Sequence, residues 1–99
     1  MKPQLIKIKT YVGFAIKSRQ IIYGVDDILK RDFKGLVLMS EALAESSSNK
    51  LKNHVTYAGG QVLSFSAEDF AQIFGNENIK AAAIIDNGLA VAIKKNMTN

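Results

Sequence analysis

The 99-residue chain has no cysteine and only one histidine, His54. Without cysteine it cannot form disulfide bridges, thiolate zinc sites or cysteine nucleophiles. A single histidine argues against a histidine-rich metal site and against a catalytic triad within one chain. The acidic residues are isolated or adjacent at a helix start, so no pair is suited to general acid–base catalysis. We therefore expect neither an enzyme nor a metal or cofactor site.

Long apolar runs and low-complexity tracts are also missing. No run approaches the ~20 residues of a bilayer-spanning helix. Lys7 and Lys9 interrupt the first apolar stretch, which therefore lacks the uninterrupted core of a signal peptide. Hydrophobic residues make up 47% of the chain, which is ordinary for a folded protein. We expect residues 1–99 to form a single domain, soluble in a reducing cytoplasm and without a membrane partner.

Positive charge is in modest excess, with 13 Lys and Arg residues, nine Asp and Glu residues and a net charge of +4. This balance mildly favours an anionic partner. Five basic residues are close in sequence: Lys17, Arg19, Lys30, Arg31 and Lys34. On one face they would contact phosphates, which supply affinity rather than specificity. Asp32 among them is equally consistent with an ordinary solvated surface.

Hydrophobic spacing predicts alternating helices and strands. Helices are expected over residues 4–17, 25–33, 67–74 and 89–96, and strands over 21–23, 36–39, 61–65 and 81–85. Within residues 44–54, the serines at 46–48 would cap a helix that carries Lys50, Leu51 and Lys52, and residues 55–57 would begin an extended piece. Ser66 with Asp69 resembles a capping box, and Gly75 is a well-placed helix stop. Short connections between alternating elements predict an α/β fold with a central sheet between helices.

The segment from Ile21 to Lys30 is the most informative in the chain. It combines a short strand, Gly24, and a helix start with Asp26, Asp27 and Lys30. A glycine permits a sharp turn and brings backbone N–H groups close to a ligand, as at helix N-termini that bind phosphate. A routine helix start explains the same residues, with two acids favouring the helix dipole and Lys30 pairing with Asp26.

A second candidate segment is the loop of residues 75–80. Its small polar residues surround one apolar side chain, Ile79, which could hold a splayed base, although most loops of this length only connect. Phe65, Phe70 and Phe74 are expected in the core; a stacking platform for single-stranded nucleic acid would need them exposed. His54 is expected to be the polar end of a helix.

Six segments, in this order and spacing, resemble the family of ribosomal proteins L-seven-Ae and L-thirty-e, especially its small bacterial, YlxQ-type members. They are residues 12–18, 22–24, 35–40, 42–47, 66–75 and 83–90, which together span nearly the whole chain. The resemblance implies a three-layer α/β/α sandwich with a mixed four-stranded sheet. It also implies binding of structured RNA, either ribosomal or kink-turn-like with tandem sheared G·A pairs, and possible association with the ribosome; DNA is not expected.

In kink-turn binders of this family, the glycine is followed shortly by Asn-Glu and then by Lys. The matching positions here are Gly24, Asp26, Asp27 and Lys30. Asp26 replaces an amide by a carboxylate, which loses a donor and adds a charge near phosphates, and Asp27 is one methylene shorter than Glu. A lost bidentate base contact costs ~1–3 kcal/mol, so these changes predict weakened kink-turn preference with phosphate attraction retained. The family's second RNA-contacting loop corresponds to residues 76–80 here. Ile79 fits an apolar base contact in that loop, whereas Glu77 departs from the family's pattern.

The resemblance and the charge pattern together give an expected RNA-binding set. Gly24 and Val25 would offer backbone donors, Asp27 and Lys30 would face base edges, and Ile79 would pack on an unstacked base. The complete expected set is Arg19, Gly24, Val25, Asp26, Asp27, Lys30, Arg31, Lys34, Asn78, Ile79 and Lys80. The alternative is a protein-interaction module on the same fold, in which the two acids at 26 and 27 face a basic partner.

Overall fold

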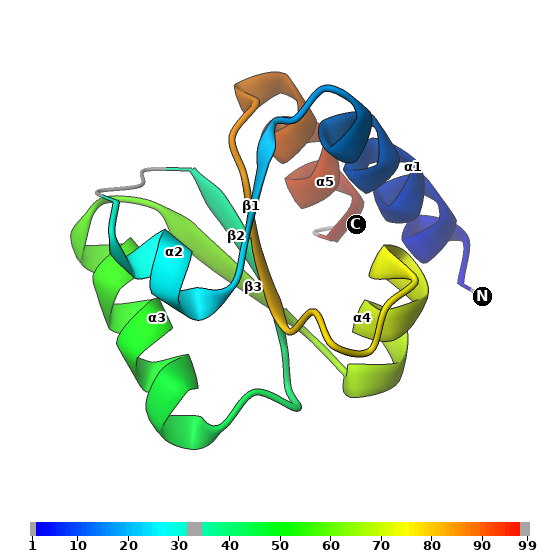
Figure 1. Ribbon diagram of the computed structural model, residues 1–99. Coiled ribbons are helices and arrows are strands. Elements are labelled where there is room, and N and C mark those ends of the chain that lie inside the picture. Colours follow the sequence, from blue (N-terminus) through cyan, green and yellow to red (C-terminus); the bar gives the residue numbers. More distant parts are fainter. Residues whose placement is uncertain (1, 32–34, 98–99) are drawn as a thin grey trace.

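The computed structural model describes residues 2–31 and 35–97 (Figure 1). Helices and strands alternate along these residues, as the hydrophobic spacing predicts. The elements are α1 (Pro3–Lys17), β1 (Ile21–Tyr23), α2 (Val25–Leu29), β2 (Leu36–Ser40), α3 (Glu45–Tyr57), β3 (Gln61–Phe65), α4 (Ala67–Phe74), β4 (Ala81–Ile84) and α5 (Asn87–Met97).

The strands form one mixed sheet in the order β1-β4-β2-β3. β2 and β3 are parallel, with Ser40 opposite Phe65, and β4 is antiparallel to both β1 and β2. The last residues of β1, β2 and β3 are therefore at the same end of the sheet as the first residues of β4. We call this side of the molecule the carboxyl end of the sheet, and the opposite side the amino end.

Helices cover both faces of the sheet, which makes a three-layer α/β/α sandwich. Figure 1 shows α1, α4 and α5 on one face and α2 and α3 on the other. In β2, Leu36 and Leu38 pack into the first layer, and Val37 and Met39 pack into the second. Successive side chains of a strand point to opposite faces. Because each face of β2 is covered by helices, the strand needs an unbroken apolar sequence, and all five of its residues are buried.

Two local signals of the sequence are confirmed at α4. The Asp69 N–H donates to Ser66 Oγ at 3.1 Å, so Ser66 is the N-terminal cap. Gly75 ends the helix with φ 68° and ψ 17°, the left-handed conformation that favours glycine. Phe70 and Ile73 fill the core beneath this helix. The cap and the stop fix where α4 begins and where the following loop leaves it.

The prediction of an extended piece at residues 55–57 is wrong, because α3 continues to Tyr57. Val55 is fully buried one helical turn after Leu51, so it extends the apolar stripe of the helix. The β-branched residues Val55 and Thr56 favour a strand locally, but packing against β2 and β3 outweighs that preference. The predicted serine cap is also wrong, since α3 begins at Glu45, before the serines.

Two further boundaries differ from the sequence prediction by two residues or more. α2 ends at Leu29 and not near Phe33, which lies outside the described residues together with Asp32 and Lys34. α5 begins two residues earlier than expected, at Asn87. There the Leu89 N–H donates to Asp86 Oδ1 at 2.9 Å, so Asp86 caps the helix.

Candidate nucleic-acid interface

The fold joins the two segments that the sequence singles out. The Gly24 N–H donates to the Ala81 carbonyl at 3.0 Å, and the Ser40 N–H donates to the Lys80 carbonyl at 2.9 Å. The start of α2 and the end of the 75–80 loop therefore lie side by side at the carboxyl end of the sheet. In open α/β sheets this is the end at which ligands bind. The hydrogen bond between Gly24 and Ala81 therefore joins two segments that are far apart in the sequence.

Gly24 makes the bend that opens the site. Its backbone has φ 89° and ψ 145°, a region that residues with a side chain rarely adopt. A Cβ built at this position would meet no heavy atom within 4 Å, so the bend is exposed to solvent. Gly24 also offers no side chain to cap α2. The chain can therefore approach a ligand closely here through its backbone at Gly24 and Val25.

The side chains that follow the bend carry opposite charges. Lys30 Nζ lies 3.8 Å from Asp27 Oδ1, with both side chains largely exposed. The pairing with Asp26 that the sequence suggested is not formed, because α2 has only five residues and ends at Leu29. An exposed pair at this distance contributes little to stability. Both side chains of the pair thus remain accessible to a ligand.

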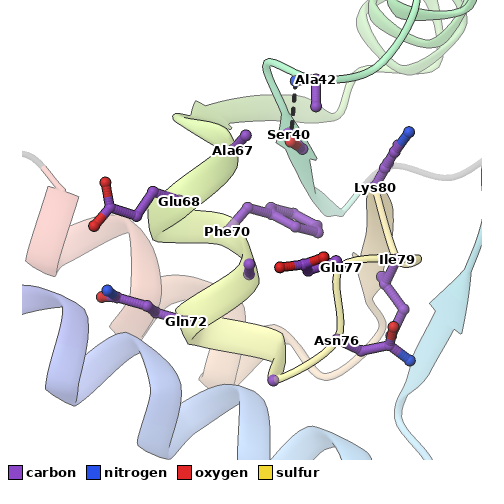
Figure 2. A pocket seen from close by; sticks show the side chains of 12 residues that line it. Ser40, Ala42, Ala67, Glu68, Phe70, Gln72, Asn76, Glu77, Ile79 and Lys80 are labelled. Atoms are coloured by element: carbon purple, nitrogen blue, oxygen red, sulfur yellow. Dashed lines mark hydrogen bonds between the residues drawn. The ribbon is translucent and has the colours of Figure 1, made fainter.

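A cavity of about 680 Å³ lies beside the loop, between α4 and the carboxyl ends of the strands. Figure 2 shows the Phe70 ring pointing from α4 toward the loop, and the Glu77 carboxylate pointing from the loop toward α4. Ile79 and Lys80 line the side of the cavity nearest β4, and Ser40 closes it at the end of β2. Its volume falls in the range of small-molecule sites, ≈ 300–1,000 Å³.

Ile79 and Lys80, both in the expected RNA-binding set, line this cavity together, and residues of α4 and the end of β2, which the sequence did not indicate, also line it. Phe70 is buried in the core, as expected, and its ring lies beneath the cavity lining. Asn78 does not line the cavity; its N–H donates to Asn76 Oδ1 at 2.8 Å, a bond that shapes the loop. Only the sheet topology shows that the end of β2 meets this loop.

The predicted basic cluster is divided by the fold. Gln20 pairs with Ile85 at the amino end of the sheet, so Arg19, just before it, lies at the far end of β1 from Gly24. The ring Nε2 of His54, near the end of α3, contacts the Arg31 carbonyl, which places Arg31 at the amino end as well. Lys34 lies outside the described residues. The structure therefore does not bring Arg19 to the Gly24 bend, whereas Arg31 lines a groove together with Tyr23, Asp27 and Lys30.

Acidic residues gather instead at the carboxyl end. Asp26 and Asp27 begin α2, Glu41 follows β2, and Glu77 lies in the loop beside Lys80. α1 and α5, by contrast, contain lysines and no acid: Lys7, Lys9, Lys17, Lys94 and Lys95. Lysines in the last turn of a helix and acids in its first turn are each favoured by the helix dipole. Negative charge is therefore concentrated near the start of α2 and the 75–80 loop, whereas the charged residues of α1 and α5 are all positive.

Within residues 2–31 and 35–97, no group of three or more His, Cys, Asp or Glu side chains could hold a metal ion. In the same part of the chain, none of the helices combines the length and apolar character needed to cross a bilayer. Among the ionisable groups, Tyr23 in β1 is perturbed: partial burial raises the pKa of its phenol above the ordinary value of 10.0.

No model of a known protein family matches the chain, and no curated protein matches it. Among solved structures, the chain is similar to a protein with unknown function from Bacillus halodurans, with a TM-score of 0.82 and 16% sequence identity. The similarity covers 94% of this chain and 98% of that one. It supports the α/β fold over nearly the full length of both proteins.

Proposed function

We propose that this protein binds a structured RNA at the carboxyl end of its sheet. The observation that carries the proposal is the junction of the Gly24 bend with the 75–80 loop, joined by the hydrogen bond from Gly24 to Ala81. Sequence-specific RNA binding mostly targets loops and bulges whose unstacked bases can leave the helix. The bend, the exposed Asp27–Lys30 pair and the neighbouring cavity together offer the contacts that such a base and its flanking nucleotides need.

Each part of the site has a chemical role in this proposal. Lys30 donates to guanine O6 or N7, and Asp27 accepts from a base N–H, once the two side chains separate. The flipped base enters the cavity, where the partly exposed Ile79 supplies apolar contact. Lys80 meets a phosphate. A ribosomal or kink-turn-like RNA, in which a sharp bend exposes bases, has the shape that this surface fits.

Electrostatics set the expected affinity. Asp26, Glu41 and Glu77 repel phosphates at the site, so the RNA backbone must follow Lys30 and Lys80. Few phosphate contacts mean modest affinity with a shallow dependence on salt. Discrimination therefore comes from the bend and the cavity more than from charge. Replacing Glu77 by Gln removes one repulsive charge and should strengthen binding.

A second candidate function is a protein-interaction module, which the same acids favour. Asp26, Glu41 and Glu77 would face lysine or arginine side chains of a partner. Charge substitutions distinguish the two functions. Removal of these carboxylates weakens binding of a basic peptide or protein, whereas it strengthens binding of RNA.

The test is a fluorescence anisotropy titration with a labelled kink-turn RNA and a simple hairpin RNA of equal length. We expect tighter binding of the bent RNA, a loss of about tenfold or more for Lys30→Ala because a base contact is worth ~1–3 kcal/mol, and a gain for Glu77→Gln. Lys50→Ala, on the exposed surface of α3, is the matched control and should leave binding unchanged. The proposal fails if neither RNA binds at low salt.

A further inference from the structure

β1 has an open side. It stands at the edge of the sheet with β4 as its only partner among the described strands. The Gly24 N–H donates to Ala81, and the Ile85 N–H donates to Gln20, so residues 20, 22 and 24 direct their backbone groups toward β4. In an antiparallel ladder the alternate residues direct theirs the other way. The N–H and C=O groups of Ile21 and Tyr23 therefore face outward.

A groove runs along this open side. Its volume is about 680 Å³, and β1 and α2 line it: Ile21, Ile22, Tyr23, Asp27, Lys30 and Arg31. Tyr23 is 38% exposed, an unusual amount of aromatic surface for a strand residue. The groove thus combines unpaired strand backbone with apolar and charged side chains of both signs. An extended segment that pairs with the edge of β1 would hydrogen-bond the outward backbone groups and place its side chains in the groove.

The charges at the two ends of β1 indicate what that strand is. Arg19 precedes β1 and Asp26 follows it, and along the groove Asp27 is followed one turn later by Lys30 and Arg31. The two ends of β1 therefore carry opposite charges, positive at Arg19 and negative at Asp26. If a second copy of this strand runs antiparallel to the first, every positive end lies beside a negative end.

We propose that the protein forms a twofold symmetric dimer in which β1 pairs antiparallel with β1 of a second copy. With Ile22 facing Ile22 at the twofold axis, Ile21 pairs with Tyr23 of the other copy, and the outward groups form four backbone hydrogen bonds. This register sets Arg19 opposite Val25 of the other copy, one residue from Asp26, and the twofold axis repeats the contact. The two sheets join into one continuous sheet of eight strands, with both α2 helices on the same face.

The opposite edge of the sheet lacks this complementarity. β3 is preceded by Ala58-Gly59-Gly60 and followed by Ser66-Ala67-Glu68, so an antiparallel copy would bring no cation beside the acid. β3 therefore gains hydrogen bonds but no ion pairs from self-association. β1 is short, and four hydrogen bonds alone support only a weak complex, so the charged ends decide which edge pairs.

The dimer does not depend on RNA binding, but it overlaps the proposed RNA site, because Asp27 and Lys30 line the groove that the second copy occupies. Arg19 of the second copy would supply positive charge next to Asp26, at the end of the sheet where acids gather. Self-association is measured without RNA, so failure of either proposal is distinguishable from failure of the other.

Sedimentation velocity over a concentration series tests the dimer. The average mass should rise with concentration from 10.8 kDa toward twice that value. Arg19→Asp and Asp26→Arg should each weaken self-association at least tenfold, because each creates two like-charge contacts. Arg19 has φ 58°, a conformation in which Asp is well tolerated, so the first variant should fold normally.

The decisive experiment mixes the two single variants. In the mixed dimer both pairs again carry opposite charges, so an equimolar mixture should associate at least tenfold more tightly than either variant alone. The double variant should recover self-association in the same way. Tyr23→Pro removes an outward N–H without losing a bond to β4, and should abolish the dimer while circular dichroism shows an intact fold. Lys50→Asp on α3 is the control that should leave association unchanged.

Three results would overturn the proposal. One is a wild-type protein that stays monomeric at every concentration. This result counts against the dimer even if the protein binds a foreign extended peptide at β1. Another is a mixture of the two charge variants that associates no better than each alone. The third is a folded Tyr23→Pro variant that dimerises as well as the wild type, which would place the interface elsewhere.

Discussion

Replacing Gly24 by Ala tests whether the bend is held in a conformation that only glycine adopts at low cost. Because an added Cβ meets nothing within 4 Å, no steric clash contributes and the whole effect is backbone strain. Strain of this kind costs about 1–3 kcal/mol. The variant also loses freedom in its unfolded state, which offsets about 0.4–1 kcal/mol. We expect the free energy of unfolding to fall by about 1–2 kcal/mol, or Tm by roughly 4–16 °C for a domain of this size.

Gly13 provides the matched control. It lies within α1, does not have a positive φ, and a Cβ there also meets nothing within 4 Å. Gly13→Ala should therefore raise the stability by about 0.5–1 kcal/mol, since alanine favours a helix over glycine. Urea unfolding followed by circular dichroism, with an unchanged m-value, measures both. The reasoning is refuted if Gly24→Ala is as stable as the wild type or shifts in the same direction as Gly13→Ala.

Three further predictions concern the core, a cap and a titrating group. Ser66→Ala should lower the free energy of unfolding, measured by urea denaturation, by about 1 kcal/mol because the hydrogen bond from the Asp69 N–H is lost. Ser66→Asp should keep most of the wild-type stability, because aspartate also accepts this bond. Ala83→Leu should lower the free energy of unfolding by ~1–3 kcal/mol or more through overpacking, because Ala83 is fully buried on β4 between β1 and β2. An unchanged urea midpoint would contradict the packing described for β4. The raised pKa of Tyr23 means that its neutral phenol is favoured in the folded state, so stability present below the ordinary value of 10.0 is lost as pH rises through the raised pKa. Tyr23→Phe should make that alkaline loss smaller in urea titrations across this pH range, and an identical pH profile would show that the phenol does not contribute.

The sequence predicted the layer structure because its strongest local signals agree with the tertiary fold. β2 is apolar without alternation, and two covered faces require that pattern. Ser66 and Gly75 mark the two ends of α4 by chemistry that depends only on neighbouring backbone groups. The end of α3 was missed because Val55 and Thr56 favour a strand on their own. Their helical state depends on packing with Leu51 and the sheet, which no short window contains.

The candidate site was predicted only in part, for a different reason. Gly24 and Lys80 were both singled out, and the antiparallel pairing of β1 with β4 brings them together. Arg19 is five positions before Gly24 in the sequence but lies at the opposite end of β1. Sequence proximity therefore gave the wrong grouping of charges. Which cations share a surface depends on the strand order, and spacing along the chain does not determine that order.

The position of β4 has a consequence for how the protein assembles during synthesis. Among the described residues, β4 is the last strand along the chain, yet it stands between β1 and β2 and is the one strand that joins β1 to the rest of the sheet. A nascent chain that has reached Lys80 can pair β2 with β3, but β1 has no strand to join. Synthesis proceeds at ≈ 5–20 residues per second, so the first strand waits through most of translation for the last. Insertion of residues 81–84 then completes the sheet late in synthesis, and a truncation just before Ala81 should leave β1 without a strand to pair with.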